Sequence, residues 1–138
     1  VLVPFLLAHE TGGRAVRAAS AGTYLVGSVI CHQRPDRSFR PWGVQMPVRA
    51  RCAGLYLGAA VGTLLAGVRR PAGRGTARTA LRAIRMMVLA AAVPTAATWL
   101  GEAVGLVVFA EGVRAAAAVP LGAAVAWVVS LVIRGELA

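Results

Sequence analysis

The chain has 138 residues, of which 58% are hydrophobic and only 14% charged, and its formal net charge is +10. An ordinary soluble domain is roughly 45–50% apolar and about 25% charged, so this composition excludes intrinsic disorder and argues against a soluble globule. All basic side chains are arginines, and they cluster between apolar runs, which indicates contact with anionic lipid headgroups and not with nucleic acid. The sequence therefore predicts one integral membrane domain over residues 1–138, with the lipid bilayer as its partner.

An all-α, polytopic membrane helix bundle is expected from the apolar runs, because a helix needs about 20 predominantly apolar residues to cross a bilayer. The apolar start, Val1–Ala8, is too short to span and stays unassigned. The sequence predicts about four helices, joined by glycine-containing connections at Pro71–Thr79 and Gly101–Val113. Their expected ranges are Arg14–Cys31, Ala50–Val68, Thr79–Leu100 with a kink at Pro94, and Ala115–Ile133.

The distribution of arginine predicts the orientation in the cytoplasmic membrane. The segment Arg69–Arg85 holds six arginines and no acidic residue, which assigns it to the cytoplasm, because cytoplasmic loops carry an excess of basic residues. Alternation of the helices then places nine arginines on the cytoplasmic side and six on the other. The loop from Cys31 to Cys52 is therefore expected to be extracytoplasmic.

Small residues recur every fourth position on two of the predicted helices. Gly54, Gly58 and Gly62 form one stripe, and Gly122 opens a second stripe that continues through Ala126 and Ser130. Such stripes let two helix backbones approach closely in a membrane. We expect these faces to pair, either inside one chain or across a homo-oligomer or larger membrane complex.

The segment Cys31–Gly58 is the richest in chemically active groups. It contains both cysteines, one of the two histidines and five of the fifteen arginines. Its prolines prevent a long helix, so the cysteines can meet only by chain reversal. Cys31 and Cys52 are candidates for a disulfide, for two free buried thiols, or, with His32, for a metal or reactive thiol site.

Arginines of the same segment suggest a second kind of site. Arginine recognises phosphate and carboxylate groups through paired hydrogen bonds. The alternative is that Asp36 pairs with one of the arginines and that lipid phosphates meet the others. The candidate anion-binding residues are Arg34, Arg37, Ser38, Arg49 and Arg51.

Three blocks of this segment carry a family resemblance: Cys31-His32-Gln33, Arg37-Ser38-Phe39, and Arg51-Cys52 followed by Gly54, Tyr56 and Gly58. They resemble a family of small predicted membrane proteins of bacteria and archaea, classed as a domain of unknown function. The resemblance extends from about Cys31 to the end of the chain and implies a membrane location. Where that family has the first cysteine of a Cys-x-x-Cys pair, this chain has Arg49, which argues against a closed four-ligand zinc site.

Enzyme signatures are absent, since the sequence contains no P-loop, no Gly-x-Ser-x-Gly and no His-Glu-x-x-His. The first hypothesis is an accessory or binding membrane protein with a Cys/His/Arg site at the membrane face, for an anion, a lipid headgroup or a metal ion. One alternative is a thiol-redox or metal-dependent membrane enzyme. Another is a structural subunit of a larger membrane complex.

Overall fold

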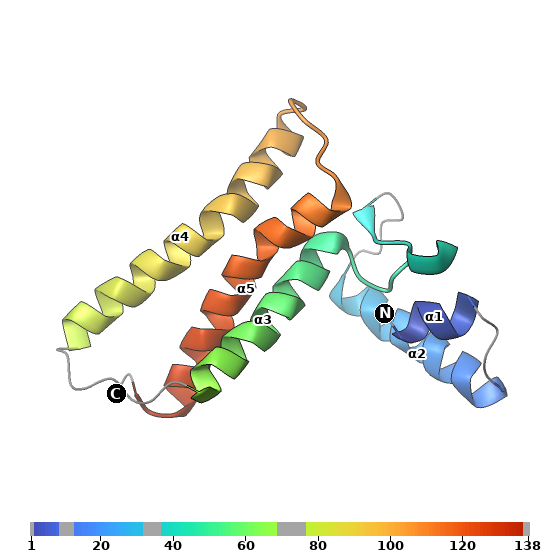
Figure 1. The fold of residues 1–138 in the computed structure, drawn as a ribbon, viewed down its shortest axis with the longest axis horizontal. Helices are drawn as coiled ribbons and strands as arrows, with labels where there is room; N and C mark the ends of the chain where they lie inside the picture. Colours follow the sequence, from blue (N-terminus) through green and yellow to red (C-terminus); the bar gives the residue numbers. More distant parts are fainter. Residues whose placement is uncertain (1, 9–12, 32–36, 69–76, 137–138) are drawn as a thin grey trace. The chain divides into compact units, whose positions relative to one another are not determined.

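The computed structural model describes residues 2–8, 13–31, 37–68 and 77–136, and every regular element in these ranges is helical. Three of the helices found there are long and apolar enough to cross a membrane, whereas α2 has only 17 residues. The all-α membrane bundle expected from the sequence is thereby confirmed. The elements in chain order are α1 (Leu2–Ala8), α2 (Arg14–Ile30), the 3-10 turn η2 (Pro41–Gly43), α3 (Ala50–Val68), α4 (Ala77–Ala103) and α5 (Glu111–Ile133) (Figure 1).

Several boundaries differ from those that the sequence predicts. The helices α4 and α5 extend toward each other, so the connection that was expected over Gly101–Val113 shrinks to residues 104–110. Glu111 lies in the first turn of α5, where a negative charge is favoured by the helix dipole. The helix α4 continues through Pro94. The unassigned apolar start forms the short helix α1.

The chain divides into two compact units, Val1–Ala53 and Gly54–Ala138. In the first unit, α1 packs against α2 and against η2. The aromatic rings of Phe5 and Trp42 meet edge to face, with their centroids 5.3 Å apart. This contact attaches the turn at 41–43 to α1, because edge-to-face aromatic pairs contribute about 0.5–1.5 kcal/mol beyond the area that they bury.

In the second unit, α5 lies between α3 and α4 (Figure 1). The backbones of α3 and α5 approach so closely that a Cβ added to Gly58 would lie 2.1 Å from the carbonyl oxygen of Val119. The corresponding distance from Gly54 to the oxygen of Ala115 is 2.0 Å, and from Gly122 to the oxygen of Leu55 it is 2.1 Å. The structure thus places glycines of both stripes in contacts within one chain.

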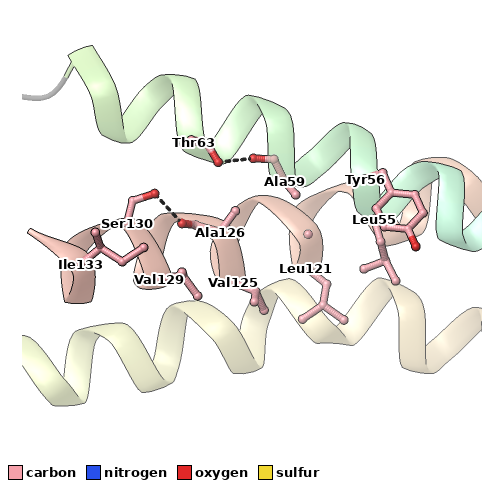
Figure 2. A pocket seen from close by; sticks show the side chains of 11 residues that line it. Leu55, Tyr56, Ala59, Thr63, Leu121, Val125, Ala126, Val129, Ser130 and Ile133 are labelled. Carbon is pink, nitrogen blue, oxygen red and sulfur yellow. Dashed lines mark hydrogen bonds between the residues drawn. The ribbon is translucent and has the colours of Figure 1, made fainter. Parts of the chain in front are cut away.

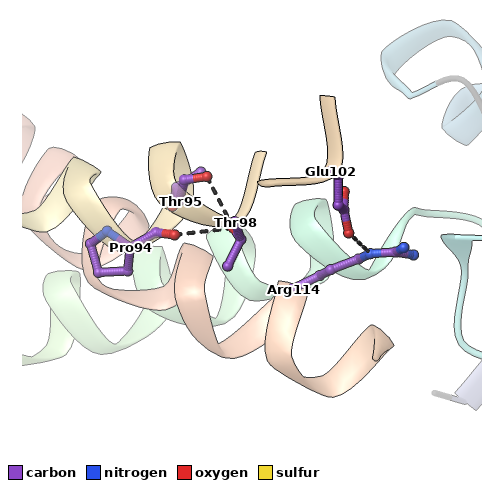
Figure 3. A network of polar contacts seen from close by, with 5 residues as sticks. All are labelled: Pro94, Thr95, Thr98, Glu102 and Arg114. Atoms are coloured by element: carbon purple, nitrogen blue, oxygen red, sulfur yellow. Dashed lines mark hydrogen bonds and ion pairs between the residues drawn. The ribbon is translucent and has the colours of Figure 1, made fainter. Parts of the chain in front are cut away.

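Polar contacts join α4 to α5, and Figure 3 shows one of them, the pair of Arg114 and Glu102. Thr95 donates its hydroxyl proton to the carbonyl of Ala117 over 2.8 Å. Closer to the connection between the helices, Arg114 donates a hydrogen bond to Glu102, and both side chains are at least 92% buried. Since buried charges are stable only when they are paired, this ion pair fixes the end of α4 against the start of α5.

The outward faces of α3, α4 and α5 are apolar. Leu64, Met86 and Val132 are 71%, 65% and 60% exposed, as expected for side chains that meet lipid. An open groove of about 530 Å³ runs along α3 and α5. The hydroxyls of Thr63 and Ser130 lie in it but donate to carbonyls of their own helices (Figure 2), so the walls of this groove are apolar.

Replacing Gly58 by alanine should loosen the contact between α3 and α5. The added methyl group meets backbone atoms of Val119 and Ala123 at less than 3.0 Å, and overpacking of this kind costs about 1–3 kcal/mol. The same replacement at Gly67, where nothing lies within 4 Å, should leave stability unchanged or slightly raised. Unfolding of both variants in detergent micelles measures the difference, and equal free energies of unfolding would contradict the close approach.

Replacing Glu102 by glutamine should leave Arg114 buried without a negative partner. We expect a loss of about 3–5 kcal/mol in the free energy of unfolding, as when one partner of a buried ion pair is removed. The matched control is Glu136→Gln, because the Glu136–Arg134 pair is 3.7 Å apart and its side chains are 30% and 39% exposed. That variant should lose less than about 1 kcal/mol, and a comparable loss in both would refute the proposed role of the buried pair.

Candidate thiol site

The two cysteines of the chain come together in the first unit. Cys31 caps the C-terminal end of α2, where its backbone N–H donates to the carbonyl of Gly27 over 2.8 Å. Cys52 lies in the first turn of α3. The chain reverses between these helices and brings the two Sγ atoms to 3.3 Å from each other, in a thiol hydrogen bond. Both cysteines are free thiols in this structure.

The two thiols differ in their access to the surroundings. Cys31 is only 5% exposed, whereas Cys52 is partly exposed. The neighbouring Ala50 has no exposed surface at all. Cys52 is thus the more exposed of the two residues.

The segment 37–49, which precedes α3, forms a hydrogen-bonded loop. The backbone N–H of Met46 donates to the carbonyl of Phe39 over 2.8 Å. From α2, the hydroxyl of Tyr24 donates to the carbonyl of Gln45. Ser38 has no exposed surface, so the loop is packed and not loosely attached.

The tip of this loop has an unusual backbone. Trp42 has φ = 55° and ψ = 29°, and Gly43 follows with φ = 77°. A left-handed conformation costs roughly 1–2 kcal/mol for a residue other than glycine. The edge-to-face contact of Trp42 with Phe5 offsets part of this cost.

The candidate anion-binding residues that the structure describes lie on both sides of the loop tip. Arg37, Arg49 and Arg51 are each partly exposed, and no acidic residue occurs in the segment 37–53. Arg49 is adjacent to the thiols, since its backbone is hydrogen-bonded to the side chain of Cys52 and its charge acts on that sulfur. His32 and Arg34 lie outside the described residues.

Within the described ranges, no three side chains of the types His, Cys, Asp or Glu are grouped as metal ligands would be. The arrangement that is present is a pair of adjacent thiols beside positive charge. Such a pair forms a disulfide when oxidised and offers two thiolate ligands when deprotonated.

Comparison with known proteins places this site within a family. Residues 31–128 match the model of the family described as "Predicted membrane protein (DUF2085)". The chain belongs to this family. The matched range begins at Cys31 and includes Cys52, so the whole thiol pair lies in the part of the chain that the family shares.

Two archaeal proteins are similar over shorter stretches. An uncharacterised protein of Methanocaldococcus jannaschii is 52% identical over 42 residues, which are 30% of this chain and 27% of that protein. One of Methanothermobacter thermautotrophicus is 53% identical over 30 residues, which are 22% of this chain and 27% of that protein. The chain thus matches about a quarter of the length of each relative. No solved structure matches the chain.

Sequence reasoning missed two contributors to this site, Tyr24 and Gln45. Tyr24 is the one aromatic side chain in α2, and a buried Tyr hydroxyl usually requires an acceptor. That signal indicates a tertiary contact for Tyr24, but nothing local identifies Gln45, whose acceptor is its backbone carbonyl.

Replacing Tyr24 by phenylalanine should loosen the loop 37–49. The variant loses one partly buried hydrogen bond to the Gln45 carbonyl, worth about 1 kcal/mol. We expect faster cleavage by trypsin after the arginines of this loop. Tyr56→Phe is the matched control, because the Tyr56 ring is 52% exposed. If both variants are cleaved at the wild-type rate, the Tyr24 contact does not hold the loop.

Proposed function

We propose that this integral membrane protein acts in the cytoplasmic membrane through Cys31 and Cys52, which switch between a dithiol and a disulfide. The observation that carries the proposal is the 3.3 Å distance between the two Sγ atoms. A disulfide bond is about 2.05 Å long, so only a small movement of the two side chains separates this contact from a covalent bond.

The positions of the two cysteines favour a reversible switch. Cys31 ends one helix and Cys52 begins another, so a bond between them closes a loop without crossing the body of either helix. Closing a loop of this size stabilises a fold by about 3 kcal/mol through the entropy of the unfolded chain. The oxidised state is thus expected to hold the loop 37–49 more firmly than the reduced state does.

The proposal also includes an orientation of the chain in the membrane. Arg82 and Arg85 are exposed near the start of α4, within the arginine-rich segment that we place in the cytoplasm. With Arg69–Arg85 on that side, one passage of α3 through the membrane puts Cys52 at the extracytoplasmic face. Disulfides form and persist on that side of a bacterial membrane.

The proposal gives the arginines a role at the thiol site and treats a bound metal ion as the alternative. Arg49 lies against Cys52, so the arginine group serves the thiol site as a source of positive charge that attracts anions. Two thiolates also suit a soft metal ion, and His32 follows Cys31 directly in the sequence. We treat metal binding as the competing outcome of the test below.

Oxidation of the purified protein should convert both thiols into one intramolecular disulfide. Wild type treated with diamide should lose two hydrogens by intact mass and, once unfolded in SDS, take up no maleimide-polyethylene glycol, whereas reduced protein unfolded in the same way takes up two. Cys31→Ser and Cys52→Ser are matched controls, which should each keep one reactive thiol or form intermolecular dimers.

Two results would overturn the proposal. One is a wild-type protein whose two thiols both remain reactive after diamide. The other is stoichiometric zinc in wild type that protects both thiols and is lost in Cys52→Ser, which would show a metal site in place of the redox pair.

A further inference from the structure

We propose that α2 does not cross the membrane but lies in the plane of one leaflet, the leaflet on the side of the thiol pair, with its exposed apolar face among the acyl chains. The partner of this face is the lipid itself. The inference replaces the expectation that the segment Arg14–Cys31 spans the bilayer. It uses the position of the two cysteines and not their chemistry, so it is independent of the proposed redox switch.

The two cysteines set the depth of one end of α2. Cys52 lies in the first turn of α3, and α3 is long and apolar enough to cross the membrane, so Cys52 lies near a membrane face. The Sγ atom of Cys31 is 3.3 Å from that of Cys52. The C-terminal end of α2, which Cys31 caps, therefore lies near the same face.

The length of α2 does not suit a helix that crosses the bilayer from this face. Its 17 residues extend over about 25 Å, whereas the hydrocarbon core is about 30 Å thick. Its first turn carries the exposed side chains of Arg14 and Arg17. Only the 13 residues of Ala18–Ile30 remain as an uncharged stretch, a length typical of re-entrant or interfacial segments.

The loop 37–49 lies against the middle of α2 and gives the stronger argument. The hydroxyl of Tyr24 donates to the carbonyl of Gln45. Tyr24 precedes Cys31 by seven residues, which is about 10 Å along the helix axis, and helical side chains lean toward the N-terminus of their helix. If α2 were perpendicular to the membrane, Gln45 would therefore lie about 10 Å below the membrane face.

Such a depth is incompatible with the exposed tip of this loop. Trp42 is 51% exposed, and Arg40 and Gly43 are exposed as well. Irregular backbone does not face lipid inside the hydrocarbon region, because its N–H and C=O groups would find no water there. With α2 in the membrane plane, the loop stays at the level of the headgroups, where Trp side chains are common.

The exposed face of α2 suits the acyl chains of a leaflet. Four apolar side chains near its C-terminal end are between 59% and 85% exposed: Leu25, Val26, Val29 and Ile30. The hydroxyls of Thr23 and Ser28 donate to carbonyls of their own helix, so they require no water. At the other end, Arg14 and Arg17 are exposed and complement the charge of anionic headgroups.

The in-plane position changes the expected side of two arginines. Arg14 and Arg17 move to the side of the thiols, so that side holds eight arginines and the side of Arg69–Arg85 holds seven. The orientation in the cytoplasmic membrane then depends on the six arginines within Arg69–Arg85 and not on the total for each side.

A single lysine reports the side on which α2 begins. The chain contains no lysine, so an introduced one is a unique side-chain amine, and both cysteines stay in place. At Gly13 nothing lies within 4 Å of an added Cβ. A membrane-impermeant amine reagent, applied to intact bacterial cells and to inverted vesicles, should label Gly13→Lys from the same side as Val108→Lys and from the side opposite to Glu136→Lys. Peptide mass spectrometry assigns each label.

Spin labels measure the depth of α2 in vesicles that contain phosphatidylglycerol. Gly22→Cys and Val29→Cys, seven residues apart on one face, are labelled singly in a background with both native cysteines replaced by serine. Access to oxygen and to a nickel chelate should give the same depth for both, whereas a perpendicular helix would separate them by about 10 Å. Val61→Cys and Val68→Cys, seven residues apart on the spanning helix α3, are the matched control and should differ by about 10 Å.

Three results would overturn the inference. They are labelling of Gly13→Lys from the side of Glu136→Lys, a depth difference on α2 as large as that on α3, or spin–spin broadening at Val29→Cys, which would show a second copy of the chain on this face in place of lipid. The lysine result decides alone if the serine background does not fold. None of these results bears on the oxidation of Cys31 and Cys52, which is measured separately.

Discussion

The close approach of α3 to α5 is the constraint on which the second unit depends. A bilayer supplies no hydrophobic force between helices, so their association relies on van der Waals contact and interhelical hydrogen bonds. Gly58, with an added Cβ only 2.1 Å from a facing carbonyl, shows that no side chain fits there. At the end of the pair, Arg134 donates to the carbonyl of Ala66 over 2.6 Å. This bond satisfies a carbonyl in the last turn of α3 that lacks a helical partner.

The same helix gives the thiol site a rigid support. Cys52 occurs in the first turn of α3, directly before the glycine stripe that begins at Gly54. A reactive group on a packed helix keeps its position more accurately than one on a loop. Cys31 is held in a comparable way, because its backbone caps α2. Each cysteine is therefore held through the backbone of a helix end.

The sequence predicts the helices better than their ends and their contacts. Apolar runs bounded by arginine predict α2 and α3 to within one residue, whereas the facing ends of α4 and α5 are predicted too short. Glu102 and Glu111 are typical of a loop in a membrane sequence, but Arg114 neutralises the first and the helix dipole favours the second. Composition alone identifies the segment Cys31–Gly58. It leaves the state of the cysteines open, because their distance depends on a chain reversal that local patterns do not encode.

In the sequence, the thiols and the arginines suggest two separate sites, one for a metal or redox reaction and one for an anion. The contact of Arg49 with Cys52 argues that they serve one site. Arg49 places a permanent positive charge three residues before Cys52 in the chain. A cation beside the sulfurs disfavours a bound metal ion. Arg49 is thus an argument for a redox thiol pair over a metal site at these cysteines.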